Sequence, residues 1–223
     1  MTEEKRSFFP RPHIQTLSDL IFGLALSIGA ITLIGHQPTN AQQVFVAVGL
    51  YGFSFLILVN IWRAYSNTMS TLPFETGGLV NLNIILLFLV SIEPYLYYQV
   101  MVFTNENWNG VSTAFALDLG LMYLILAFFS HTLANEEKKL VPSNLLKKFR
   151  VKRNMQLLVS AAFFLSIAPI FYSTNAFSLS VEGASRGVPV RAALWIFILF
   201  LSLLRHPLEA LESRRKQPST QPT

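Results

Sequence analysis

Four ionisable side chains interrupt the long apolar stretches of this 223-residue chain, namely Asp19, Glu93, Asp118 and Arg191. An ionisable group in hydrocarbon is costly, about 2.5–3.5 kcal/mol at the centre of a helix, so it usually pairs with another group or faces water. Glu93, Asp118 and Arg191 all fall in the outer half of the apolar stretches. We therefore expect at least one carboxylate to reach Arg191 and the other to be hydrated or protonated. The alternative is that all three side chains extend independently to the membrane interface.

The residue types that enzymes and metal sites need are not arranged for catalysis. Cys is absent, which excludes disulfides, thiolate zinc sites and cysteine nucleophiles. The sequence contains no GxxxxGK, HExxH or GxSxG motif and no clustered metal ligands. The four histidines lie near the ends of the apolar stretches, where an imidazole serves more often as a polar anchor than as a ligand. We therefore expect neither an enzyme nor a site for a metal or an organic cofactor.

The composition indicates a membrane protein. Charged residues make up only 13% of the chain, whereas a soluble domain carries about 25%. Hydrophobic residues make up 52%, and 19 of the residues are phenylalanine. A water-soluble domain needs more polar surface than these proportions supply. The apolar content is also too high for a disordered chain.

Six apolar stretches are long enough to cross about 30 Å of hydrocarbon as helices, which takes roughly 20 residues. Continuous apolar runs favour helices over barrel strands, which alternate with period two. The sequence therefore predicts an all-α membrane protein with a six-helix domain over residues 1–206 and a cytoplasmic tail, 207–223, that is disordered at its end. We expect the first stretch to remain as a span, since no signal-peptide cleavage site follows it. The predicted spans cover about residues 17–35, 44–62, 79–100, 111–129, 155–173 and 188–204.

The distribution of Lys and Arg predicts the orientation in the membrane. With both termini in the cytoplasm, all but Arg186 and Arg191 of the 17 basic residues lie on the cytoplasmic side. The basic loop 138–153 would then lie beside the inner leaflet, where anionic lipids are its expected partners. No basic–aromatic groove pattern accompanies the charge, so we expect no nucleic-acid partner. The expected location is the cell membrane, with multiple spans.

Three segments in the first 100 residues resemble the transmembrane protein 175 family of potassium channels. Residues 17–19, Leu-Ser-Asp, are similar to the Phe-Ser-Asp signature that opens the first helix of that family. The second stretch ends with Asn-Ile-Trp at 60–62 and resembles the family's second helix, which ends in Trp followed by a His pair. Residues 86–95 are similar to the family's third helix, Leu-Leu-Phe followed by Ser-Leu-x-Pro-Phe. By these three segments in this order, the chain is identified as a divergent prokaryotic member.

Several positions depart from the family pattern. Leu17 replaces the Phe of the signature, and His13 stands where the family has Arg. Tyr65 and Ser66 stand where it has the His pair, and Ser27 stands where it has Thr. The fold therefore transfers from the family more safely than its conduction properties.

The resemblance implies a homotetramer that passes potassium ions, with the first helix around a central pore and no carbonyl filter. No TVGYG-like run occurs in the sequence, which agrees with that expectation. The predicted function is therefore a potassium-permeable cation channel. The alternative is a non-conducting membrane scaffold or transporter subunit of the same fold.

The resemblance also assigns the constriction of this pore. Leu24 occupies the position of the family's filter Ile, and Ser27 that of the following Thr. Leu24, Ile28 and Ile31 recur at i, i+4 and i+7 and so share one stripe of the first helix, which by itself indicates only a lipid-facing or core surface. With the resemblance, we predict that this stripe constricts the pore. Ser27 would add a ring of hydroxyls, or would allow close helix approach as a small residue.

Ser18 and Asp19 start the first helix at the cytoplasmic edge. A carboxylate there suits the positive end of the helix dipole, so the pair could be only a helix-start signal. The resemblance implies instead that the pair anchors the inner mouth of the pore through contacts to other helices. Candidate partners at a similar depth are Arg11, His13, Arg63 and Arg205.

Overall fold

The computed structural model describes residues 11–35, 41–71, 77–102, 108–136, 140–181, 184–198 and 200. The chain divides into two compact units, Met1–Pro169 and Ile170–Thr223. The predicted tail, 207–223, and its boundary at residue 206 lie outside the described residues.

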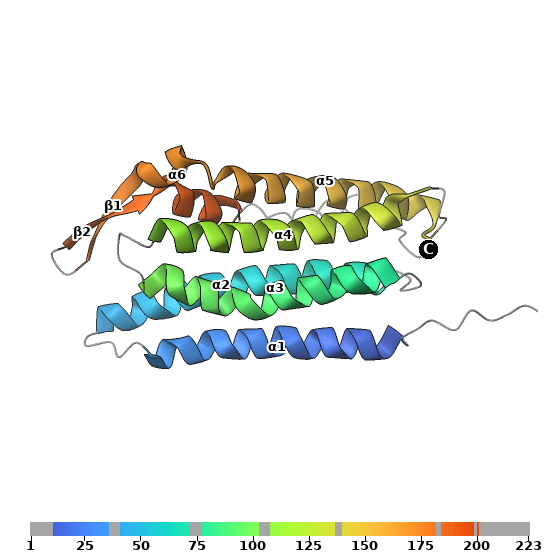
Figure 1. Cartoon of the computed structure of the whole chain (residues 1–223), viewed down its shortest axis with the longest axis horizontal. Coiled ribbons are helices and arrows are strands. Elements are labelled where there is room, and N and C mark those ends of the chain that lie inside the picture. Colours follow the sequence, from blue (N-terminus) through green and yellow to red (C-terminus); the bar gives the residue numbers. More distant parts are fainter. Residues whose placement is uncertain are drawn as a thin grey trace, which may run out of the picture. The chain divides into compact units, whose positions relative to one another are not determined.

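The first unit is a bundle of five helices (Figure 1). In this bundle α1 packs against α2 and α3, and α3 lies between α1 and α4. α4 also contacts α2 and α5, and it carries much of the buried apolar core, including Phe115, Leu119, Met122, Leu126 and Phe129. α4 is therefore the central helix of the unit. The helices are α1 (Arg11–Gly35), α2 (Ala41–Met69), α3 (Gly77–Val102), α4 (Trp108–Ala134) and α5 (Ser143–Leu165).

Four stretches of the described chain are long and apolar enough to cross a membrane. They coincide with the first four predicted spans. The sixth predicted span, 188–204, lies partly outside the described residues. Within this span, residues 190–198 and 200 are helical. The four stretches are Ile14–Ile31, Ala47–Met69, Gly78–Val100 and Trp108–Ala134.

The region of the predicted fifth span is organised differently from the expectation. α5 begins at Ser143 rather than at residue 155, so one helix holds both the basic segment and the following apolar residues. It ends at Leu165, and a short helix, α6 (Pro169–Ser173), follows. Prolines bound both helices: Pro142 is the N-cap of α5, and Pro169 is the first residue of α6. Proline suits these positions because it disfavours helix in the preceding residue.

Each of the last four carbonyls of α5, those of residues 162–165, accepts a hydrogen bond. The backbone N–H groups of Ser166, Ile167 and Ala168 donate to three of these carbonyls at 3.0–3.1 Å. The Ser166 hydroxyl donates to the fourth, that of Phe163, at 2.6 Å. The last carbonyls of a helix otherwise need water or another donor, so this end is satisfied within the chain.

The second unit contains a β-hairpin of β1 (Asn175–Val181) and β2 (Ala184–Pro189), paired antiparallel. In β1, apolar residues alternate with serines at 178 and 180, a period-two pattern typical of a strand. This hairpin is an addition to the helical fold that the sequence predicted. Its alternating run is much shorter than a membrane span, so long apolar stretches give no indication of it.

α4 and α5 pack closely where Gly120 faces α5. A Cβ at this position would lie 2.8 Å from the ring of Phe164, so only glycine fits without displacing that ring. The Ser160 hydroxyl donates to the Gly120 carbonyl at 2.8 Å across the same contact. Small residues allow this kind of close approach between membrane helices.

Candidate functional site

α1 has one face packed in the bundle and one face directed outward. Ser18, Phe22 and Ala25 lie one helical turn apart and are at most 1% exposed. Leu24, by contrast, is 58% exposed and Ile31 61% exposed. No helix of the described chain covers the stripe that the sequence assigned to the constriction, so these apolar side chains must contact lipid, another copy of the chain or a pore. The outward residues are Leu17, Leu20, Leu24, Ile28 and Ile31.

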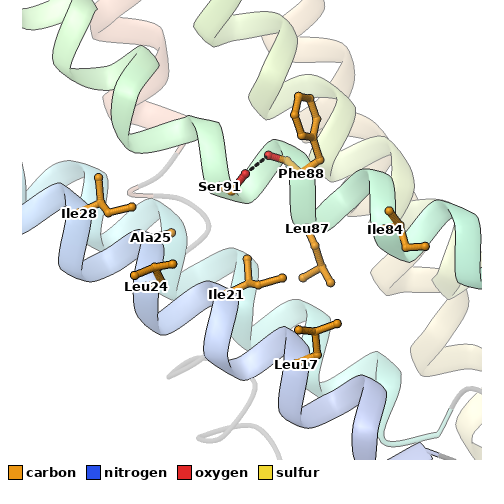
Figure 2. A pocket seen from close by; sticks show the side chains of 9 residues that line it. All are labelled: Leu17, Ile21, Leu24, Ala25, Ile28, Ile84, Leu87, Phe88 and Ser91. Atoms are coloured by element: carbon orange, nitrogen blue, oxygen red, sulfur yellow. Dashed lines mark hydrogen bonds between the residues drawn. The ribbon is translucent and has the colours of Figure 1, made fainter. Parts of the chain in front are cut away.

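An apolar groove of about 310 Å³ runs between this stripe and α3 (Figure 2). Leu24 and Ile28 line it from α1, and Ile84 and Phe88 line it from α3. Its one polar side chain is Ser91, whose hydroxyl donates to the Phe88 carbonyl at 2.7 Å. The groove therefore suits apolar contacts rather than the coordination of an ion.

Ser27 lies on the exposed side of α1. Its hydroxyl donates to the Gly23 carbonyl at 2.9 Å, so its oxygen lone pairs remain available on the outside of the helix. No atom lies within 4 Å of a Cβ built on Gly23, so no described helix makes the close approach that was the alternative interpretation. Both interpretations of Ser27 stay predictions, because each depends on a second copy of the chain.

A buried hydrogen-bond cluster joins the first three helices at the predicted inner end of α1. The Ser18 hydroxyl has one proton and donates it either to the Tyr65 hydroxyl, 2.6 Å away, or to the Ile14 carbonyl, 2.8 Å away. The Tyr65 hydroxyl donates to Asn83 Oδ1 at 2.8 Å. Ser18 and Tyr65 are fully buried, and the Tyr65 ring packs against Phe22 at 5.6 Å between centroids. The cluster fixes α1, α2 and α3 relative to one another.

Asp19 lies beside this cluster on the exposed side and accepts a hydrogen bond from Trp62 Nε1 at 3.0 Å. Trp62 was not among the partners predicted from the sequence. Arg63 forms no ion pair with Asp19 in the part of the chain that the structure describes. The other candidates, Arg11, His13 and Arg205, have side chains outside that part.

Sequence reasoning missed the polar partners of Ser18 and Asp19. Trp62, Tyr65 and Asn83 are neutral, whereas the partners expected from the sequence were charged residues and histidine. Asn81 and Asn83 in the run from Leu79 onward are a usable signal, because a neutral polar side chain in an apolar helix also needs a partner.

The intramembrane charges fall in different places. Glu93 is fully buried and accepts a hydrogen bond from the Ser54 hydroxyl at 3.1 Å. Asp118 is 3% exposed, and neither of its carboxylate oxygens has a hydrogen-bond partner among the described residues. Arg191 belongs to the second unit, where its guanidinium carbon lies 4.9 Å from the centroid of the Tyr172 ring. The expected pairing of a carboxylate with Arg191 stays a prediction.

The outward stripe of α1 and the inner hydrogen-bond cluster both lie in residues 13–94. This is the segment that matches the family model described as endosomal/lysosomal potassium channel TMEM175. Over this segment the chain is similar to the TMEM175 family. The match is to a family of channels and not of enzymes, in agreement with the absence of catalytic motifs.

Two solved structures of TMEM175 proteins share the fold. The crystal structure of a lysosomal potassium-selective channel TMEM175 homolog from Chamaesiphon minutus has 12% identity and a TM-score of 0.57, over 87% of this chain and 97% of that chain. A variant of the potassium channel MtTMEM175, in complex with a nanobody–MBP fusion protein, has 14% identity and a TM-score of 0.56, over 95% of this chain and 96% of that chain. At such identities the likeness establishes the fold alone. No curated protein sequence matches the chain.

We expect Asp19→Ala to lower the melting temperature of the assembled protein and to promote its dissociation into single chains. The change removes the acceptor for Trp62 Nε1 and therefore a contact between α1 and α2. Thermal melting in detergent, followed by size-exclusion chromatography, measures both effects. Gln15→Ala, one turn earlier and also exposed, is the control. An Asp19→Ala protein that assembles and melts like the wild type would sink the anchor prediction.

Proposed function

We propose that the chain is the subunit of a potassium-permeable cation channel in the cell membrane, assembled as a homotetramer with α1 around a central pore. The observation that carries the proposal is the outward apolar stripe of α1, which no other described helix covers. When several copies of the chain assemble around a symmetry axis, each copy can bury this stripe against the two copies beside it. The potassium channels among its TMEM175 relatives support the choice of ion.

The proposed selectivity follows from the chemistry of the stripe. Four copies of Leu24 around an axis would form a ring that offers no oxygen to an ion, so a cation must shed part of its water to pass. The larger potassium ion loses water at a lower cost than sodium does. Selection by dehydration is weaker than selection by a filter of carbonyl oxygens. The outward lone pairs of Ser27, one turn further, would ease the loss of water.

The second candidate is a non-conducting scaffold or transporter subunit of the same fold. Only the channel conducts ions, so the decisive experiment is potassium release from liposomes that contain the purified protein. We expect release that exceeds that of protein-free liposomes and that is faster for potassium than for sodium. Absence of release from liposomes that contain the assembled protein would favour the scaffold.

Anionic lipids are the proposed partners of the basic half of α5. Here Arg150 pairs with Glu136, and Arg153 contacts His131, whereas Lys147 and Lys148 are exposed and form no ion pair within the described residues. The exposed face of α5 then becomes apolar, as expected where a helix passes from headgroups to acyl chains. Lys138 and Lys139 of the predicted lipid-contacting loop lie outside the described residues.

We expect the double change Lys147→Gln and Lys148→Gln to weaken the binding of phosphatidylglycerol by about 1 kcal/mol for each charge. The double change of the same residues to Arg keeps both charges and should bind like the wild type. The measurement is the rise in melting temperature on titration with phosphatidylglycerol, compared with phosphatidylcholine. Equal rises for the Gln and Arg variants would contradict the assignment.

A further inference from the structure

Lys152 differs from the exposed lysines of α5 because its amine reaches across to another helix. Its Nζ donates to the Ala64 carbonyl at 3.0 Å and to Thr68 Oγ1 at 2.7 Å, both in the last turns of α2. The side chain is only partly exposed, which is unusual for lysine without a charged partner. No carboxylate lies within 4 Å of it among the described residues. The contact therefore joins α5 to the end of α2 without an ion pair.

The number of acceptors matches the neutral amine rather than the ammonium group. A neutral amine has two N–H donors, and two acceptors lie in reach. An ammonium group has three donors, so its third has no protein acceptor in the described part of the chain. It also brings a charge into a partly buried site with a positive neighbour, Lys148, one turn earlier.

The same turns of α2 also contact the inner end of α1. Trp62 donates to Asp19, and Tyr65 bonds to Ser18, within two turns of the residues that Lys152 contacts. Movement of the end of α2 relative to α5 would thus also move the inner end of α1, where the outward stripe begins. α5, α2 and α1 form one continuous series of hydrogen-bonded contacts.

We propose that Lys152 is a pH-dependent latch between α5 and α2, which tightens when its amine loses a proton and so fixes the end of α2 that positions α1. The contact itself does not depend on the proposed function, whereas its effect on ion flux does. Loss of the proton keeps both hydrogen bonds and removes the charge and the unmatched donor. Protonation favours the movement of the side chain out toward water or lipid headgroups.

The direction of the pH dependence follows from the site. Burial, and secondarily the charge of Lys148, lowers the pKa of Lys152 from its ordinary value of 10.5 to about 8. Below pH 8 the amine is charged whether it is docked or not, and docking is weakest. As the pH rises from about 8 toward 10.5, the docked form has already lost its proton while the undocked form has not, so docking strengthens. Between pH 7 and 9 the ratio of docked to undocked forms should rise about tenfold.

Other titratable groups lie near the contact. The comparison with Lys152→Arg separates their titration from that of Lys152, because this change leaves all of them in place. The neighbours are Lys148, Arg150 and Arg153 on α5, Arg63 and Tyr65 on α2, and His131 and Glu136 at the end of α4.

The test is hydrogen exchange of the last turns of α2 in the full-length protein, divided by the intrinsic exchange rate at each pH. We expect wild-type protection to rise about tenfold from pH 7 to 9. In Lys152→Arg, whose side chain stays charged, the protection should remain at the wild-type level of pH 7. In Lys152→Gln, whose side chain is neutral and can donate hydrogen bonds, the protection should equal the wild-type level of pH 9 over the whole range. Lys147→Gln, on the exposed face, should retain the wild-type rise.

A flat wild-type profile, or a rise in Lys152→Arg equal to that of the wild type, would overturn the proposal. Potassium flux from liposomes is the second readout and should change over the same pH range in the wild type but not in Lys152→Arg. If no liposomes release potassium, the proposed channel function fails, and hydrogen exchange still decides whether Lys152 is a latch.

Discussion

Leu24→Ala is expected to increase ion flux and to let sodium pass with potassium. The side chain points outward from α1 and no described helix packs on it, so its truncation should leave the fold of each chain intact. Four shortened side chains widen the proposed ring, and ions then keep more of their water. A barrier lower by about 1.4 kcal/mol would raise the flux about tenfold. The measurement is the release of potassium and of sodium from liposomes.

Two further variants make this result specific. Ile28→Ala, one turn further along the stripe, should increase flux less than Leu24→Ala if Leu24 is the narrowest point. Leu158→Ala, at a leucine on α5 that is also more than half exposed, should change neither flux nor ion preference. Unchanged flux and preference in Leu24→Ala, with the oligomer intact, would place the constriction elsewhere.

Tyr65→Phe should destabilise the protein by about 1–2 kcal/mol. The change keeps the aromatic ring against Phe22 but removes the hydroxyl that joins Ser18 to Asn83. Asn83 Oδ1, on a side chain that is 3% exposed, then loses its donor in a site where water cannot readily replace it. Unfolding in detergent, followed by circular dichroism, measures the difference in the free energy of unfolding.

Tyr95→Phe is the matched control, because it makes the same chemical change at an exposed position on α3. We expect it to change stability by less than about 0.5 kcal/mol. Equal effects of the two substitutions would show that the hydroxyl of Tyr65 contributes nothing to holding the three helices together.

Much of the first unit could be predicted from the sequence because the physics involved is local. A run such as 111–129, as a helix, is about as long as the hydrocarbon core of a bilayer is thick, and a helix satisfies its backbone groups within the segment itself. The division of α1 into a buried and an outward face also follows from its period. Ser18 and Asp19 were identified as contact residues from the family resemblance and not from this local pattern.

The partners of these residues could not be predicted in the same way. Ser18 and Tyr65 are 47 positions apart, and no periodicity relates them. Their contact depends on how α1 and α2 pack, which a single sequence does not report. The continuity of α5 was also not predicted, since hydropathy separates the basic segment from the apolar one although the same helix contains both.

The satisfied end of α5 determines what this helix can do inside a bilayer. A helix that stops within hydrocarbon ordinarily draws in water, because each bare carbonyl there costs several kcal/mol. Here turns and the Ser166 hydroxyl occupy all four carbonyls, and Pro169 begins the next helix without an N–H that would need an acceptor. The interruption therefore divides the fifth apolar stretch into two segments without leaving any of these four carbonyls bare.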